Sequence, residues 1–210
     1  MFKRGKKFTL IELIVVIAVL GILAAIVIPN ISNFQNKARD TQLTADTRNV
    51  QTALDMYRLE QPDGAEPILV DGSENKVTLT ATHEFDKDGN LQEISVKVGE
   101  DEDDKPIYAK EKHYRVLDLN ELYPNYLRQI PKYAVVDPAV INAKDASQIA
   151  FEDGGKVVFA TLLEYELDEN GKVVFNEDGM AIASNKSTAI VNALSYVKDA
   201  DGNPQLTVVR

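Results

Sequence analysis

The sequence predicts an α+β fold, in which a long N-terminal helix packs against an antiparallel β-sheet. Residues 8–28 are apolar apart from Thr9 and Glu12, which indicates a helix that lies among apolar neighbours. Apolar residues then recur at helical spacing as far as Leu59, and beyond Gly64 the chain changes to short alternating strands and turns. Of the 210 residues, roughly 150 follow the helix, which is enough for one domain with its own core.

The first helical segment, residues 8–30, is long enough to cross a membrane, since residues 8–28 alone span about 31 Å as a helix. It follows a basic leader, residues 1–7, whose four cations are Lys3, Arg4, Lys6 and Lys7. The positive-inside rule places such a leader in the cytoplasm and exports the rest of the chain. An ordinary signal peptide is the alternative, but the apolar run exceeds the usual length of about 7–15 residues and no small-residue cleavage site follows it.

The helix is expected to continue as an amphipathic segment over residues 31–61. Its apolar stripe consists of Leu43, Val50, Leu54 and Tyr57. The opposite face is polar, so this half needs a domain on one side only. Pro29 removes one backbone hydrogen bond and is expected to kink or loosen the helix, and Gly21 lowers helix propensity in the same region. The run Pro62–Gly64 ends the helix.

The remaining segment, residues 62–210, is predicted to be an exported β-rich domain. Alternating apolar runs are expected to form strands at residues 77–82, 91–98, 157–167, 172–175, 180–183, 188–197 and 205–209. Turns with Asp or Asn next to Gly separate several of these runs, at residues 86–90, 168–171, 176–179 and 199–203. Gly and Asn tolerate positive φ, so the pattern predicts three hairpins and an antiparallel sheet. Between the hairpins, Asp118 is expected to cap a short helix over residues 119–127.

Composition excludes several classes of function. The formal net charge is −10, and because the leader contributes +4, the chain beyond Lys7 carries −14. A body this acidic argues against nucleic-acid binding, which needs a basic surface. The chain has no cysteine, so it can form neither disulfides nor thiolate metal sites. Because it also lacks a phosphate-binding Gly loop and a nucleophile elbow, we do not expect an enzyme.

The Asp-rich turns raise the question of calcium. Hard oxygen ligands gather at Asp86 and Asp88, and again at Asp199, Asp201 and Asn203. Neither group matches the twelve-residue EF-hand loop with its closing Glu, and Asp–Gly turns are ordinary hairpin chemistry. We therefore expect no cofactor, with one calcium ion at such a turn as the alternative.

The text from Phe8 to Asn30, FTLIELIVVIAVLGILAAIVIPN, resembles the N-terminal segment of type IV pilins and type II secretion pseudopilins. Phe8, Glu12 and Pro29 stand where the family has its mature N-terminal Phe, its Glu and its Pro. The resemblance implies that a prepilin peptidase removes the leader and that assembly machinery draws the subunit from the membrane into a helical filament of many copies. Apolar helices form the filament core, where Glu12 pairs with a neighbour's N-terminal amine. Assembly residues are thus Phe8, Glu12, Pro29 and, through helix loosening, Gly21.

Processing is where this chain departs from the family pattern. The family usually has Gly immediately before the mature Phe, whereas here Lys7 precedes Phe8 and the nearest glycine is Gly5. A long cationic side chain is a poor replacement for glycine where a peptidase must approach the backbone closely. We therefore expect inefficient cleavage before Phe8.

Three functions follow from these expectations. The first is a pilin, a structural subunit of an extracellular pilus-like filament. The second is the major pseudopilin of a type II secretion system, which the similarity of TALDMYRLE, residues 52–60, to major pseudopilins favours. The third is a membrane-anchored surface binding protein that does not polymerise. The first two require a single-pass membrane stage before assembly.

Overall fold

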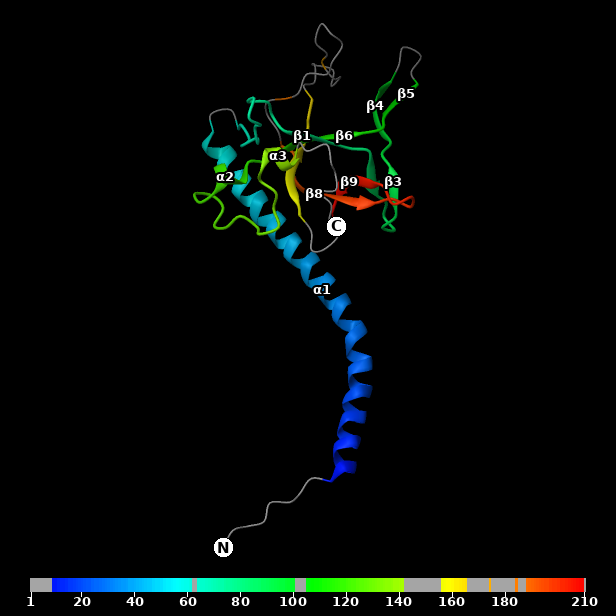
Figure 1. Ribbon diagram of the computed structural model, residues 1–210. Helices are drawn as coiled ribbons and strands as arrows, with labels where there is room; N and C mark the ends of the chain where they lie inside the picture. The colour runs from blue at the N-terminus through cyan, green and yellow to red at the C-terminus, as the bar shows by residue number, and fades with distance from the viewer. Residues whose placement is uncertain are drawn as a thin grey trace. The chain divides into compact units, whose positions relative to one another are not determined.

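The computed structural model describes residues 9–61, 64–100, 105–141, 156–165, 174, 184 and 188–209. The chain forms two compact units, Met1–Leu43 and Thr44–Arg210, which we call unit 1 and unit 2 and describe separately. The helix α1, Leu10–Glu60, contributes to both (Figure 1).

In unit 1 the described structure is the first part of α1. The helix is assigned without interruption through Gly21 and Pro29, so the prediction of one long helix is confirmed. Loosening between these two residues in an assembled state stays a prediction. Among the described residues, no helix is both long enough and apolar enough to span a membrane.

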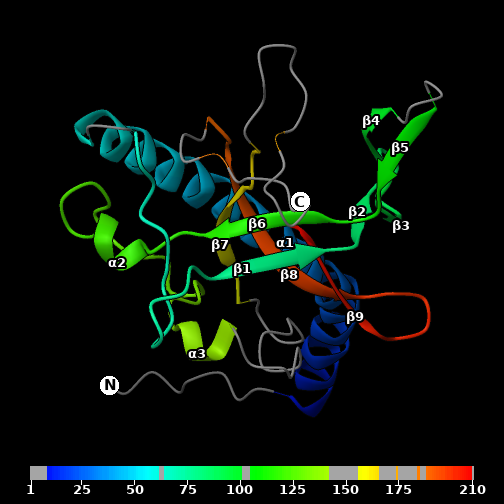
Figure 2. The same cartoon turned by 90° about the horizontal axis from the view of Figure 1, so that it is seen from above.

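Unit 2 is built on a five-stranded sheet in which every neighbouring pair is antiparallel (Figure 2). Its strands, in sheet order, are β1 (Thr78–Ala81), β6 (Lys112–Val116), β7 (Val158–Leu162), β8 (Val191–Lys198) and β9 (Pro204–Val208). Strands β8 and β9 form the hairpin that the turn at residues 199–203 predicts. The central strand of the order, β7, lies between β6 and β8.

Two smaller antiparallel ribbons form separate sheets, and the first of them lies close to β9. The first pairs β2 (His83–Phe85) with β3 (Leu91–Glu93), and the second pairs β4 (Val96–Glu100) with β5 (Pro106–Ala109). In both views β4 and β5 project from the body of unit 2 (Figures 1 and 2). Two single-turn helices, α2 (Leu119–Leu122) and α3 (Pro138–Ile141), complete the described elements.

The two faces of the five-stranded sheet differ in chemistry. One face carries an apolar core that includes Val116, Val158, Ala160 and Leu194. The other face carries the buried apolar residues Phe159, Val191 and Ala193 together with the four buried polar residues, Arg115, Thr161, Ser195 and Thr207, as strand alternation and cross-strand register require. This second face contacts α1, whose buried stripe is Val50, Ala53, Leu54 and Tyr57. The amphipathic half of the helix therefore covers this second, mixed face of the sheet.

Several predicted elements need correction. Residues 77–82 and 91–98 do not form one hairpin: the chain bends at Thr82, β1 pairs with β6, and the turn at 86–90 joins β2 to β3 instead. The helix predicted over 119–127 begins at its Asp118 cap but ends at Leu122, because Pro124 cannot continue it and disfavours helical backbone at Tyr123. Strands β2, β5 and β6 and helix α3 were not predicted. The strands expected at 172–175 and 180–183, with their turns, lie outside the described residues.

Candidate assembly site

Unit 1 presents large apolar side chains on all sides of the helix. Eleven of them between Leu10 and Leu23 are 49–77% exposed. They are Leu10, Ile11, Leu13, Ile14, Val15, Val16, Ile17, Val19, Leu20, Ile22 and Leu23. A helix that is apolar all round is stable when other helices or lipid surround it. We call these residues the apolar sleeve.

Glu12 closes a capping box at the start of α1. Its Oε2 atom accepts hydrogen bonds from the backbone N–H of Thr9, at 2.8 Å, and from the Thr9 hydroxyl, at 2.7 Å. In return the N–H of Glu12 donates to the Thr9 hydroxyl oxygen at 3.3 Å. This reciprocal pairing of an N-cap Thr with a Glu three residues later satisfies N–H groups that a helix start leaves free. The acid of the sleeve thus has an intramolecular partner within the described chain.

The other predicted assembly and processing residues are placed less fully. At Gly21 an added Cβ would meet nothing within 4 Å, so the described chain does not itself require glycine there. Pro29 lies within α1. Gly5, Lys7 and Phe8 lie outside the described residues, so their roles stay predictions.

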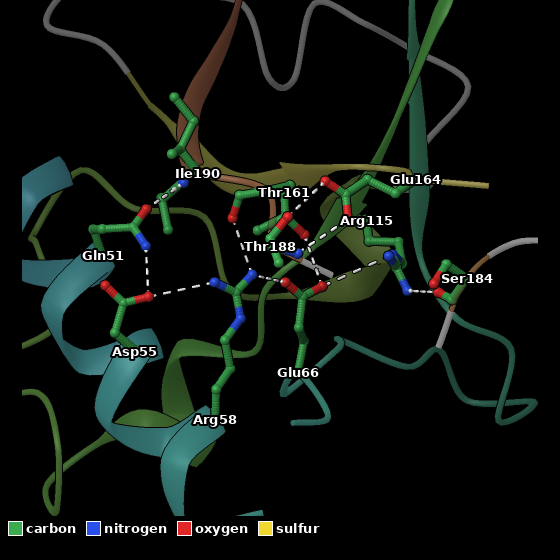
Figure 3. A network of polar contacts seen from close by, with 12 residues as sticks. Gln51, Asp55, Arg58, Glu66, Arg115, Thr161, Glu164, Ser184, Thr188 and Ile190 are labelled. Atoms are coloured by element: carbon green, nitrogen blue, oxygen red, sulfur yellow. Dashed lines mark hydrogen bonds and ion pairs between the residues drawn. The ribbon is translucent and has the colours of Figure 1, made fainter. Parts of the chain in front are cut away.

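A buried ion cluster joins α1 to the sheet in unit 2 (Figure 3). The side chain of Glu66 is 1% exposed, and its Oε1 accepts a hydrogen bond from Arg58 Nη2 on α1. Its Oε2 accepts from the Thr161 hydroxyl on β7 at 2.9 Å and lies 3.8 Å from Arg115 Nε on β6. One carboxylate therefore links the helix to two strands through the guanidinium groups of Arg58 and Arg115 and the hydroxyl of Thr161.

The same cluster also binds the segment that leads into β8. Arg58 Nη2 donates to the carbonyl of Ala189 at 3.0 Å, and Gln51 Oε1 accepts from the N–H of Val191 at 2.6 Å. Gln51 is in turn bonded to Asp55 at 2.8 Å. The entry of β8 is thus held directly against α1, as Figure 3 shows.

A second set of contacts holds the residues on either side of the long β7–β8 connection. Arg115 Nη1 donates to the carbonyl of Ser184 at 3.0 Å, and the Ser184 N–H donates to the carbonyl of Glu164 at 2.8 Å. The Glu164 carboxylate accepts from the N–H and the hydroxyl of Thr188, at 3.0 and 3.3 Å. These bonds fix the two ends of the connection to each other and to β6.

Three tyrosine hydroxyls bind acids across the junction between α1 and the segment that follows α2. Tyr57 donates to Glu121, Tyr126 donates to Glu60, and Tyr133 donates to Asp46. The rings of Tyr57 and Tyr126 also pack edge to face, with centroids 5.5 Å apart. Burial, followed by the hydrogen bond to Glu121, raises the pKa of Tyr57 to about 12. These contacts give the aromatic residues a structural role in holding α1.

Three turns of unit 2 share one hydrogen-bond pattern. Asp71, Asp86 and Asp199 each accept, through Oδ1, the N–H groups of the residues two and four places later. Hydrogen bonds from backbone N–H groups, led by that of Asn90, lower the pKa of Asp86. At Asp199 the largest cause of the lowered pKa is the hydrogen bond from Gln205.

The calcium alternative concerns the last two of these turns. Oδ2 of Asp86 accepts from the side chains of Asn90 and Gln92, so both of its oxygens have partners within the turn. Across the described part of the chain, no group of three or more His, Cys, Asp or Glu residues is arranged to hold a metal ion. Calcium at Asp88, Asp201 or their neighbours stays a prediction.

The ion cluster was not predicted from the sequence. In the run Lys112–Val116, Arg115 alternates with the apolar Tyr114 and Val116, as a solvent-facing strand residue would, and Glu66 stands in a segment with no regular pattern. Because a charged residue at such a position usually faces solvent, the sequence carried no local signal that Arg115 is buried against Glu66. Among the described residues, the apolar sleeve is a surface available for association, and the ion cluster is a set of bonds that stabilises the fold.

Comparisons with known proteins agree on one group of relatives. The chain is 37% identical over 98 residues to the type II secretion system core protein G of Pseudomonas aeruginosa, which covers 45% of this chain and 68% of that protein. It is 42% identical over 57 residues to the core protein G of Escherichia coli, covering 27% and 39%. It is 41% identical over 58 residues to the type IV wide pilus major component PilA4 of Thermus thermophilus, covering 28% and 44%.

Apart from the Pseudomonas protein, this chain covers less than half of each of these relatives. No family model matches the chain. No solved structure matches it either.

Proposed function

Because the chain belongs to the family of type II secretion system core protein G and is a pilin-like structural subunit, we propose that many copies polymerise into a helical filament through the apolar sleeve. The observation that carries the proposal is the exposure of the sleeve, whose eleven large side chains are at least 49% exposed in a single copy. Burying apolar surface contributes about 25 cal/mol per Å². Packing of sleeves from neighbouring copies is therefore the step that stabilises the filament.

The kind of filament follows from the relatives. The match to core protein G of Pseudomonas aeruginosa extends over 98 residues, whereas the matches to core protein G of Escherichia coli and to the pilus component PilA4 extend over 57 and 58 residues. The longest of these matches favours a secretion-system filament, which we place first, with an extracellular pilus as the second candidate. A surface binding protein that never polymerises is the third, and the relatives, which are components of a secretion system and of a pilus, argue against it.

Before assembly, the sleeve and its flanking apolar residues are proposed to lie in the membrane. The sequence supports this stage, since residues 8–28 are apolar apart from Thr9 and Glu12 and follow four cations in residues 1–7. A prepilin peptidase and the assembly machinery are the proposed partners at this stage, and unit 2 is the exported part. The proposal assigns the chain no catalytic role.

One experiment separates the candidates. The full chain is expressed with its own assembly genes, and cells are examined by negative-stain electron microscopy before and after shearing. Filaments labelled by an antibody against unit 2, together with loss of protein export in a deletion strain, support the secretion filament. Labelled filaments with normal export support the pilus. The absence of any labelled filament under conditions where the chain is made would overturn polymerisation.

A further inference from the structure

One face of α1 in unit 2 is covered by no other described residue. It consists of Ala45, Arg48, Thr52, Met56 and Leu59, which we call the outer stripe. All five are exposed, and Met56 and Leu59 are 50% and 87% exposed. Ala45, Thr52 and Leu59 recur every seven residues, so the outer stripe runs along one side of the helix. The buried stripe of α1 lies on the opposite side.

The outer stripe is less polar than its composition suggests. The hydroxyl of Thr52 donates to the carbonyl of Arg48 at 2.9 Å, so its hydrogen-bonding need is met by its own helix. It therefore presents a methyl group between the side chains of Ala45 and Met56. A partner that covers the stripe would desolvate apolar groups without leaving this hydroxyl unpaired.

The acids that border the stripe already have partners. On one side Asp55 accepts from Gln51 and forms an ion pair with Arg58 at 3.3 Å. On the other side Glu60 accepts the hydroxyl proton of Tyr126. The stripe itself contains no acid, and its single cation, the guanidinium of Arg48, has no partner among the described residues.

This charge pattern is informative because the chain is acidic throughout. Asp and Glu number 33 against 23 Lys and Arg, so two copies repel wherever acid meets acid. The outer stripe avoids that repulsion and offers an unpaired cation to a surface rich in carboxylates. The partner whose chemistry fits is a second copy of the same acidic chain.

We propose that the outer stripe is a second contact between copies, in which Met56 and Leu59 are buried and Arg48 pairs with a carboxylate on the neighbouring unit 2. The inference rests on the proposed filament and extends its contacts from the apolar sleeve to the exported unit.

The absence of cysteine makes the contact directly testable. Leu59→Cys is introduced into the full chain, filaments are assembled, and a short bismaleimide is added. Val70→Cys is the matched control, because Val70 is also an exposed aliphatic residue, at 47%, but lies outside the stripe. We expect a ladder of cross-linked copies from Leu59→Cys and none from Val70→Cys.

Charge variants provide a second readout in the same assay. Adding Met56→Glu to the Leu59→Cys chain places an acid in the stripe, and the cross-linked yield should fall by about tenfold or more. Arg48→Glu should lower it as well, while Arg48→Lys should largely preserve it, and the difference should shrink at high salt.

The outcomes separate this inference from the proposed function. Filaments that form normally but give no ladder from Leu59→Cys overturn the stripe contact and leave polymerisation standing. A cross-link to a different protein, identified by mass spectrometry, overturns the second copy as the partner. A chain that forms no filaments at all overturns the proposed function, and the stripe contact falls with it.

Discussion

Arg58 on α1 and Glu66, eight residues further along, form an ion pair whose carboxylate is 1% exposed. The pair spans the end of the helix and turns the chain back onto the sheet, where Glu66 also accepts from Thr161. Burying charges is costly, so such a pair is tolerated only when both partners are present and hydrogen bonded. This pair therefore determines where α1 can dock.

Glu66→Gln should destabilise unit 2 by about 3 kcal/mol, because it keeps the shape but leaves the buried guanidinium of Arg115 without a charged partner and Arg58 with only the exposed Asp55. Glu84→Gln is the matched control, since Glu84 pairs with Lys112 at the surface with its side chain 42% exposed, and exposed pairs contribute at most about 1 kcal/mol. Urea denaturation of both variants and the parent chain measures the difference. Equal losses of unfolding free energy in the two variants would show that the buried pair stabilises the protein no more than the exposed pair does.

The repeated turns give a prediction about backbone conformation. Glu74 has a φ of +62°, at the place where the matching turns have Gly89, at +86°, and Gly202, at +85°. This conformation costs about 1–2 kcal/mol for a residue with a side chain, whereas for glycine the main cost is a smaller one in chain entropy. Glu74→Gly should therefore stabilise the protein by roughly 0.5–1 kcal/mol.

The reverse change provides the control for this prediction. Gly202→Ala should destabilise by about 1 kcal/mol although its Cβ would meet nothing within 4 Å, so the effect is conformational and not steric. Gly72→Ala, in an equally open place without positive φ, should cost little. Thermal unfolding of the three variants ranks them, and a loss at Gly72 as large as at Gly202 would contradict the explanation.

Much of this fold could be predicted because its signals are local. The long helix follows from apolar spacing, the β8–β9 hairpin from the turn at residues 199–203, and the start of α2 from Asp118. Strand β6 could not be predicted in this way. Its pairing with both β1 and β7 depends on residues far apart in sequence, and its buried Arg115 is stabilised by Glu66, which no local pattern connects to it.

The residues of the candidate site also differ in whether they could be predicted from the sequence. The apolar sleeve and Glu12 could be recognised from sequence, because a single acid in an apolar run is conspicuous. The partners of Asp46, Glu60 and Glu121 could not, since each is a tyrosine at least 64 positions away. Contacts between residues so far apart in sequence produce no periodic pattern from which they could be predicted.

High pH should loosen the docking of α1 through Tyr57. Its pKa is raised to about 12 in the folded chain by burial and by the bond to Glu121, against about 10 when unfolded. The unfolded chain therefore loses this proton first, so the associated stability is fully present below pH ~10 and is lost as the pH rises toward ~12. Tyr57→Phe should make stability fall less steeply over that interval. Denaturation at a series of pH values measures the slope, and an unchanged slope in the variant would exclude Tyr57 as a contributor.

Glu12 combines two roles that one pair of variants can separate. The carboxylate caps α1 by accepting from the N–H and hydroxyl of Thr9, and the family resemblance assigns it a charge pairing with a neighbouring copy. Glu12→Ala removes both roles, so it should still insert in the membrane but give few or no filaments. Glu12→Gln keeps an oxygen that can accept from Thr9 and removes only the charge.

If charge pairing drives assembly, Glu12→Gln should fail as completely as Glu12→Ala, whereas Thr9→Ala, which loses an N-cap worth about 1 kcal/mol, should still assemble. If capping is what matters, the order reverses: Glu12→Gln should assemble and Thr9→Ala should not. Filament yield by sedimentation, normalised to the amount of each variant in the membrane fraction, decides between the two. We expect the first result. In Thr9→Ala, a helix that begins one turn later still presents most of the apolar sleeve. In Glu12→Gln, the cation of the neighbouring copy is left unpaired in a packed apolar core, where it has no substitute partner.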